Sequence, residues 1–328
     1  MSKRILVAGG AGFLGSYICE YYLGVGYIVD CLDNLSTSTG MNIRHLKKNN
    51  GFHFVQADIA SSLPKRVRDN KYQVVINLAS PASPPHYQRL AIETLQAGSQ
   101  GTLNLLELAR QSQARFFHAS TSEVYGDPEV HPQPESYWGK VHSYGPRSMY
   151  DESKRYAEAL IFSYRQKYGL SSCIARFFNT YGPRMDPEDG RVVSNFIVQA
   201  LEGHPITIYG KGLQTRSFCY VDDLVKGITA LIDSDETKPM NLGNPGEFTI
   251  KELAEMVIKK TGSKSKIVYL PLPGDDPTQR KPDITFARKM LGWSPSIPLE
   301  KGIELTIDYF AELIKKTKTD FKTPRPIL

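Results

Sequence analysis

The chain has 328 residues, of which 41% are hydrophobic and 23% charged, a composition typical of a globular protein with a large core. Its net charge is +6, and basic residues are mixed with acidic ones except in a basic stretch from Lys315 to Lys322. A nucleic-acid-binding protein would show a stripe of basic residues or a recognition motif, and neither is visible. We therefore expect no nucleic-acid partner. The modest positive charge either suits an anionic small molecule or has no functional meaning.

The remaining composition argues against metal, disulfide and membrane chemistry. Cys19, Cys31, Cys173 and Cys219 are scattered and form no CxxC pair, so neither a zinc site nor a disulfide framework is expected. No run is long and apolar enough to span a bilayer. Met1 is followed by a polar pair and then by the first expected strand, which leaves no room for a signal peptide. The sequence predicts a cytoplasmic protein with no metal and no membrane partner.

The first half of the chain alternates between short apolar runs and helical patterns. Residues 5–8 form a continuous apolar run, typical of a parallel strand covered on both faces. A helix is expected from about residue 13 to 23, ended by Gly24 and Gly26, and a second strand at 27–32. Further strands are expected at 52–57, 74–78, 116–119 and 173–178, and the clearest later helices at 103–110 and 150–168. Such alternation predicts an α/β fold with a doubly wound parallel (Rossmann) sheet.

After about residue 180 the sequence becomes rich in turns, as at 182–184 and 187–190. We expect this half to form a smaller, less regular lobe, and a strand and helix around 218–231 to return to the main sheet. The expected division is a sheet domain at 1–180 joined by 217–245, a second lobe at 181–216 and 246–312, and a basic C-terminal tail at 313–328.

Gly9, Gly12 and Gly15 follow the first strand at three-residue intervals and open the first helix. Glycine is needed there because the backbone must approach a pyrophosphate closely, and the helix N-terminus then offers N–H groups to that anion. Asp33 ends the second strand roughly 20 residues later, where a carboxylate can bind ribose hydroxyls. Because an acid there repels the extra phosphate of NADP, NAD is the expected cofactor. The alternative is a plain glycine turn with a helix-capping Asp33.

The GxxGxxG spacing resembles that of the short-chain dehydrogenase/reductase superfamily, which carries a catalytic Tyr and Lys four residues apart. Tyr150 and Lys154 have this spacing at the start of an expected helix, so both lie on one face. A tyrosine has a pKa of about 10 and is a poor base at neutral pH, but a neighbouring ammonium group favours the phenolate. Tyr150 can then accept the proton of an alcohol as its hydride leaves. The alternative is a solvated Tyr–Lys pair without function.

The expected cofactor residues lie along the strand ends, with Asp58 placed after the third strand to contact the adenine. They are Gly9, Gly12, Phe13, Leu14, Gly15, Asp33, Asn34, Asp58, Ile59, Leu78, Ala79, Ser80, Tyr150 and Lys154.

Thr121 and Ser122 follow another expected strand, and substrates bind at strand ends in sheets of this type. A hydroxyl group from either residue can hydrogen-bond to the reacting alcohol, as the third catalytic residue of the superfamily does. Glu123 comes next and has no role in a simple alcohol oxidation. Its alternative interpretation is an exposed carboxylate at a strand end.

Five segments carry family motifs: ASPASP at 79–84, TSEVYGDP at 121–128, FNTYGPRM at 178–185, DGRVVSNF at 189–196 and QRKPD at 279–283. Over nearly its full length the chain resembles the extended short-chain dehydrogenases/reductases that act on nucleotide sugars, and among them the UDP-glucuronate decarboxylases. Glu123 and Arg280 are the more selective residues, since related epimerases and dehydratases share the glycine turn and the Tyr–Lys pair.

The resemblance implies a reaction cycle on a UDP-sugar. NAD takes a hydride from C4 of the glucuronate with Tyr150 as base, the C5 carboxylate leaves as CO₂ from the 4-ketone, and the returned hydride gives UDP-xylose. Glu123 and Arg280 would assist CO₂ loss and protonation at C5. The implied catalytic residues are Tyr150, Lys154, Thr121, Ser122, Glu123 and Arg280. The implied substrate-binding residues, mostly in the second lobe, are Pro81, Asn104, Asn179, Arg191, Val193, Arg216 and Arg280.

One stretch departs from the family pattern. Gln96 stands where the family has a lysine near the sugar carboxylate, and Gly98 stands where it has an asparagine, whereas Thr102 and Asn104 match. The reaction class is therefore better defined by the sequence than the sugar is.

Other outcomes start from the same 4-keto intermediate. A 4-epimerase of the UDP-glucuronate type would not need Glu123 and Arg280 together, and another decarboxylase would release the 4-ketopentose. A non-catalytic NAD-sensing protein would be expected to have lost Tyr150 or Lys154, and both are retained.

A homodimer is also expected, because the superfamily pairs two long helices into a four-helix interface. Here those helices would be 100–110 and 150–168. Ala157, Leu160, Ile161 and Tyr164 could face the partner or only their own sheet.

Overall fold

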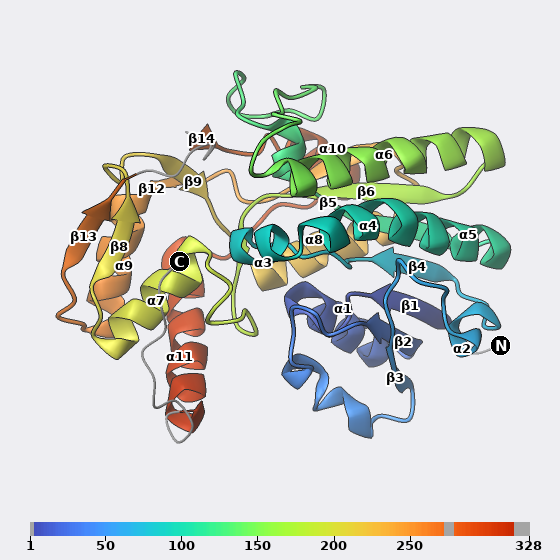
Figure 1. Ribbon diagram of the computed structural model, residues 1–328, viewed down its shortest axis with the longest axis horizontal. Coiled ribbons are helices and arrows are strands. Elements are labelled where there is room, and N and C mark those ends of the chain that lie inside the picture. The colour runs from blue at the N-terminus through green and yellow to red at the C-terminus, as the bar shows by residue number, and fades with distance from the viewer. Residues whose placement is uncertain (1–2, 272–278, 318–328) are drawn as a thin grey trace.

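A computed structural model describes residues 3–271 and 279–317 of the chain. Its centre is a seven-stranded, fully parallel sheet with the strand order β11-β6-β5-β4-β1-β2-β3 (Figure 1). The strands are β1 (Arg4–Ala8), β2 (Ile28–Asp33), β3 (Phe52–Gln56), β4 (Val74–Asn77), β5 (Arg115–Thr121), β6 (Ser172–Phe177) and β11 (Pro239–Leu242). The predicted α/β fold with a doubly wound sheet is confirmed, and the six expected strands lie within two residues of their predicted bounds.

Helices cover both faces of this sheet. On one face α1 (Phe13–Gly24), α8 (Val221–Asp233) and α10 (Thr285–Leu291) pack around Val7, and on the other α5 (Thr102–Ser112) and α6 (Ser148–Tyr168) pack around Leu6. Successive strand residues point to opposite faces, so these two neighbours belong to different cores. The short helix α2 (Lys65–Arg68) contributes Val67 to the second core.

The expected return of residues 218–231 to the main sheet is wrong for the strand. β10 (Cys219–Tyr220) pairs instead with β7 (Thr180–Tyr181), outside the main sheet. The Cys219 N–H donates to the Asn179 carbonyl, so this short ladder begins just beyond the C-terminal end of β6. The strand that does join the main sheet is β11, which pairs with β6.

The second lobe, at the left in Figure 1, is more regular than expected. Its helices α7 (Val192–Glu202), α9 (Ile250–Thr261) and α11 (Leu299–Thr317) share a third apolar core around Phe196, Leu253 and Ile303. Its small sheets are β13 (Ile267–Leu270) on β8 (Ile206–Tyr209), and β12 (Glu247–Thr249) and β14 (Gln279–Arg280) on either side of β9 (Thr215–Ser217). Residues 313–317 of the expected tail are the last part of α11, and 318–328 lie outside the described residues.

Short helical segments connect these elements. They are η1 (Met41–Ile43), η2 (Leu46–Lys48), α3 (Pro84–Arg89), α4 (Ala91–Gln96), the π-helical turn η3 (Ala97–Gly101) and η4 (Ser122–Tyr125). All four cysteines are buried free thiols, and residues 3–271 and 279–317 contain no cluster of potential metal ligands. Within the same ranges, every helix is too short or too polar to cross a bilayer.

Candidate active site

The glycine loop between β1 and α1 has the shape of a phosphate cradle. Gly9 has a φ of +75°, and a Cβ there would lie 2.7 Å from the Ala79 nitrogen. A Cβ on Gly15 would lie 2.1 Å from the Gly9 carbonyl oxygen, so the first turn of α1 packs directly on the loop. No side chain caps this helix, and no acidic residue lies in its first turn. Its free N–H groups and positive dipole end therefore suit the pyrophosphate of a dinucleotide.

Acidic residues border the cradle at the ends of the next two strands. Asp33 accepts hydrogen bonds from the backbone N–H groups of Ala11 and Leu35, at 3.0 and 2.8 Å. Burial raises the pKa of the Asp33 carboxyl group, and these hydrogen bonds oppose the rise. Asp58 accepts from the Asn34 side chain at 2.8 Å. Two carboxylates thus lie together where the ribose and adenine of a dinucleotide would be expected.

The remaining predicted cofactor residues gather at the same place. Ile59 is buried beside Asp58, and Leu78, Ala79 and Ser80 follow β4 against Gly9. The fold therefore brings together the segments predicted to hold NAD. The glycine cradle leaves room for the pyrophosphate, which a side chain at these positions would exclude.

Tyr150 lies in the first turn of α6 and is 8% exposed. Its ring stacks on Tyr87 of α3, with centroids 5.0 Å apart and planes inclined by 11°. Burial raises the pKa of Tyr150 to about 12, although a hydrogen bond with the Thr121 side chain lowers it. Without a further positive charge beside it, this phenol is therefore harder to deprotonate than that of an exposed tyrosine, and less phenolate is present near neutral pH.

Lys154 lies one turn further along α6 and is buried. Its Nζ donates to the Ala119 carbonyl of β5 at 2.9 Å and lies 5.8 Å from the centre of the Tyr150 ring. Burial lowers the pKa of Lys154 to about 8, and the negative charge of Glu158 opposes this. The ammonium group thus faces the phenol from inside the protein.

Glu123 lies between two arginines at the end of β5. Its two carboxylate oxygens form ion pairs with Arg280 at 2.9 Å and with Arg147 at 2.7 Å. Burial raises the pKa of Glu123, but the two arginines outweigh it, so the pKa is lowered overall. The alternative of a simply exposed strand-end carboxylate does not hold, because 18% of the side chain is exposed and both oxygens are engaged.

Arg280 is the most buried charge of this group, at 2% exposed. It donates to the Ser122 hydroxyl at 3.1 Å and to the Gly126 carbonyl at 2.8 Å, so it ties β14 to the segment after β5. Its Nε is buried without a hydrogen-bond partner among the described residues. Ser122 and Glu123 from one motif and Arg280 from another therefore form one contact cluster.

The other predicted substrate residues divide into two groups. Arg216 pairs with Arg280 across β9 and β14 and lowers the pKa of Glu123, and Arg191 lowers the pKa of Tyr150, so both arginines of the second lobe lie near this site. Asn179 lies next to this group through its contact with the Ser217 carbonyl, whereas Val193 is part of the core of the lobe. Pro81 is buried beyond β4.

Asn104 was predicted to bind the substrate, but it lies on the cofactor side. Its amide donates to the carbonyls of Ile59 and Ser61, at 2.8 and 3.0 Å. The prediction placed it by motif alone, and in the fold it holds the loop after β3.

The two departures from the family pattern have different surroundings. Gln96 is exposed at the end of α4, whereas Gly98 is buried in the π-helical turn. A Cβ on Gly98 would lie 2.6 Å from the Ser153 Cβ. Ser153 lies between Tyr150 and Lys154, so the absence of a side chain at position 98 is a packing requirement of the catalytic turn.

Sequence reasoning missed Arg147 and Tyr87. Arg147 stands three residues before Tyr150, and that helical spacing is a signal that could have placed it near the catalytic face. Tyr87 stacks on Tyr150 from a segment 63 positions earlier, and no local pattern predicts such a contact.

Comparisons with known proteins agree with this geometry. The chain matches the GDP-mannose 4,6 dehydratase family over residues 6–306. It is 46% identical over 324 residues to UDP-glucuronic acid decarboxylase 1 of Danio rerio (99% of this chain, 76% of that protein). It is 47% identical over 311 residues to UDP-glucuronic acid decarboxylase 1 of Arabidopsis thaliana (95% and 70%). A solved structure of UDP-glucuronic acid 4-epimerase from Bacillus cereus, in complex with UDP-glucuronic acid and NAD, is similar with a TM-score of 0.85 at 30% identity (94% and 99%).

Proposed function

We propose that this chain, which belongs to the GDP-mannose 4,6 dehydratase family, is an NAD-dependent decarboxylase that converts UDP-glucuronate to UDP-xylose and CO₂. NAD is its cofactor, and the predicted relationship to the extended short-chain dehydrogenases/reductases is confirmed. The observation that carries the proposal is the Glu123–Arg280 pair beside Tyr150. Oxidation of an alcohol alone would not need this pair.

Tyr150 is the base for the C4 hydroxyl group. The Thr121 hydrogen bond and the charge of Arg191 lower the pKa of the phenol. The Lys154 ammonium group lies 5.8 Å from the centre of the ring, and a positive charge there favours the phenolate. When bound, NAD accepts the C4 hydride and later returns it, so it is not consumed. Lys154 is held by the Ala119 carbonyl and would also bind the nicotinamide ribose.

Arg280 and Glu123 act on the second half of the reaction. The C5–carboxylate bond of the 4-ketone breaks, its electron pair forms an enolate, and C5 then takes up one proton as CO₂ leaves. Arg280 orients the sugar carboxylate, since a guanidinium group binds carboxylates in a fixed geometry. Glu123, held as a carboxylate by two arginines, orients the water that delivers the proton.

The lobe formed by residues 181–216 and 246–312 binds the nucleotide part of the substrate. Arg191 and Arg216 suit the diphosphate because the guanidinium fork can be bidentate. Asn179 stands at the junction between the lobe and the sheet domain at 1–180 and 217–245.

A UDP-glucuronate 4-epimerase is the second candidate. The similar Bacillus cereus structure favours it, because that enzyme was solved with UDP-glucuronic acid and NAD. The higher identity to the decarboxylases and the Glu123–Arg280 pair favour CO₂ loss.

The protein would act as a homodimer through α4, α5 and α6. Ala157, Ile161 and Tyr164 are buried in its own core and are not available, but Leu95 of α4 and Tyr156 of α6 are exposed apolar residues. Light scattering of the native protein and of Tyr156→Glu tests this, and a wild-type monomer would contradict it.

The deciding experiment is incubation with UDP-glucuronate and NAD, followed by product analysis and CO₂ detection. UDP-xylose and stoichiometric CO₂ are expected. UDP-galacturonate without CO₂ would support the epimerase, and unchanged substrate would contradict both.

A further inference from the structure

We propose that Glu158 is a third functional member of the catalytic face of α6, a positioning residue that holds β5 and keeps Lys154 in its ammonium form; this rests on the proposed function of Tyr150 and Lys154. Tyr150, Lys154 and Glu158 follow one another at four-residue intervals, so they lie on successive turns of one helix face. Sequence motifs include only the first two.

Each of these residues contacts one of three consecutive residues of β5. Tyr150 hydrogen-bonds with the Thr121 side chain, and Lys154 donates to the Ala119 carbonyl at 2.9 Å. Glu158 accepts a hydrogen bond from the Ser120 hydroxyl at 2.5 Å. The strand that carries the catalytic threonine is therefore fixed to the helix that carries the base by three neighbouring contacts.

Glu158 is itself held from the other side. Arg176 of β6 binds both its carboxylate oxygens, from Nε at 3.0 Å and from Nη2 at 2.7 Å, and 13% of each side chain is exposed. Arg176 also donates to the Tyr125 hydroxyl and the Glu135 carbonyl, so its own position is fixed. A bidentate pair with this little exposure keeps one geometry, unlike a mobile surface ion pair.

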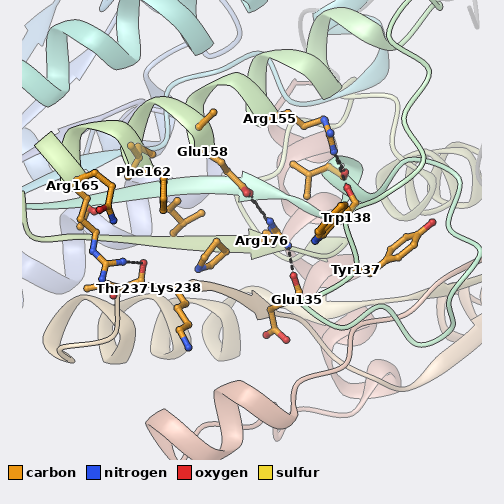
Figure 2. A pocket seen from close by; sticks show the side chains of 17 residues that line it. Glu135, Tyr137, Trp138, Arg155, Glu158, Phe162, Arg165, Arg176, Thr237 and Lys238 are labelled. Atoms are coloured by element: carbon orange, nitrogen blue, oxygen red, sulfur yellow. Dashed lines mark hydrogen bonds and ion pairs between the residues drawn. The ribbon is translucent and has the colours of Figure 1, made fainter.

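The pair lies in the wall of a cavity of about 880 Å³ on the side of α6 away from α5 (Figure 2). Figure 2 shows Glu158 pointing from α6 toward Arg176 on the sheet. The predicted cofactor residues do not line this cavity. Glu158 thus connects the catalytic helix to a cavity outside the predicted cofactor site, and its charge can be changed without touching the cofactor cradle.

The charge of Glu158 also affects the protonation of Lys154, which is a role beyond packing. Around Lys154 the charged or titratable groups are Tyr150 and Glu158 on α6 and His118 on β5. Burial and Lys154 keep the pKa of His118 well below its usual range, so this ring is neutral. Glu158 is therefore the negative charge that opposes the desolvation of Lys154, whose pKa burial lowers to about 8. Loss of that charge would lower the pKa of Lys154 further.

The test is a titration of Lys154 in the NAD-loaded protein, followed by ¹³Cε-lysine NMR and assigned with Lys154→Met. Glu158→Gln keeps the shape and removes the charge, and it should move the midpoint to lower pH by on the order of one unit. Arg176→Gln is the second variant and covers the case in which Glu158→Gln fails to fold: it removes the positive charge paired with Glu158, leaves the Ser120 hydrogen bond, and should move the midpoint to higher pH. The alkaline limb of kcat should move in parallel with the midpoint, because activity requires the ammonium form.

Ser120→Ala is the matched control. It removes the hydrogen bond but not the charge, so kcat should fall while the Lys154 midpoint stays where it is in the native protein. A midpoint that stays where it is in both Glu158→Gln and Arg176→Gln would overturn the proposal. The titration needs no substrate, so absence of CO₂ from UDP-glucuronate would count against the proposed function and not against this result.

Discussion

The cofactor side and the sugar side of this site differ in the chemical groups that form them. On the cofactor side the backbone forms the site, through a glycine loop within residues 9–15 and the first turn of α1. On the sugar side, charged side chains form it: Glu123, Arg147 and Arg280 come from three segments far apart in the chain.

This difference predicts different sensitivities. A backbone cradle tolerates changes of charge around it but not an added methyl group, because a Cβ on Gly9 or Gly15 would lie within 3 Å of backbone atoms. A charge cluster tolerates small changes of shape but not the loss of one partner, which leaves the other charge buried and unpaired. Substitutions on each side can therefore confirm or break the distinction.

The largest effect is expected at Tyr150, where the two sides meet. Tyr150→Phe removes the hydroxyl group that accepts the C4 proton, so kcat should fall by about 10²–10⁴-fold, the usual contribution of a general base. Isothermal titration with NAD should show nearly unchanged affinity, since the cradle is untouched. Full turnover by this variant would exclude Tyr150 as the base.

The next largest effect concerns the charge cluster. Arg280→Met leaves Glu123 with Arg147 alone, and the rate of CO₂ release should fall by about 10²-fold or more, as when one oriented donor is lost. NADH formation in a single turnover should fall less, because oxidation at C4 does not use Arg280. Equal losses in both steps would show that the cluster serves binding and not decarboxylation.

The difference between the two sides also explains which site residues could be predicted from the sequence. The cofactor side is local, so Gly9, Gly12, Gly15 and Asp33 could be identified from spacing and element order alone. For Glu123 and Arg280 the family resemblance supplied the expectation, and only the fold explains how β14 brings them together.

Contacts between residues far apart in the chain could not be predicted from the sequence. Tyr87, stacked on Tyr150, belongs to a different helix, and Asn104 donates to the loop after β3, more than 40 positions earlier in the chain. Strand β11 was missed because its four residues include a proline and an asparagine, which hide the apolar pattern.

A smaller effect is expected from the cofactor cradle. Gly15→Ala places a methyl group 2.1 Å from the Gly9 carbonyl, and the strain should cost about 1–3 kcal/mol, which weakens NAD binding and lowers Tm. Gly24→Ala near the end of the same helix is the matched control, because a Cβ there meets nothing within 4 Å. If both variants bind NAD like the native protein, the cradle is not the binding site.

The smallest effect is a stability change on the sugar side. Asp151 is 6% exposed, and burial, followed by the charge of Glu123, raises its pKa from 3.8 to about 7. A carboxyl group whose pKa is raised by folding stabilises the native state at low pH and loses that contribution as the pH rises through the folded value. Asp151→Asn cannot ionise, so its Tm should exceed that of the native protein by about 2–4 °C at pH 8.5 and by much less at pH 5. Glu152→Gln is the control, because it removes the same charge at the more exposed neighbouring position. Its Tm difference from the native protein should not grow with pH. If the Tm of the two variants depends on pH in the same way, the buried charge on the sugar side does not destabilise the fold. The sugar side and the cofactor side would then differ only in geometry.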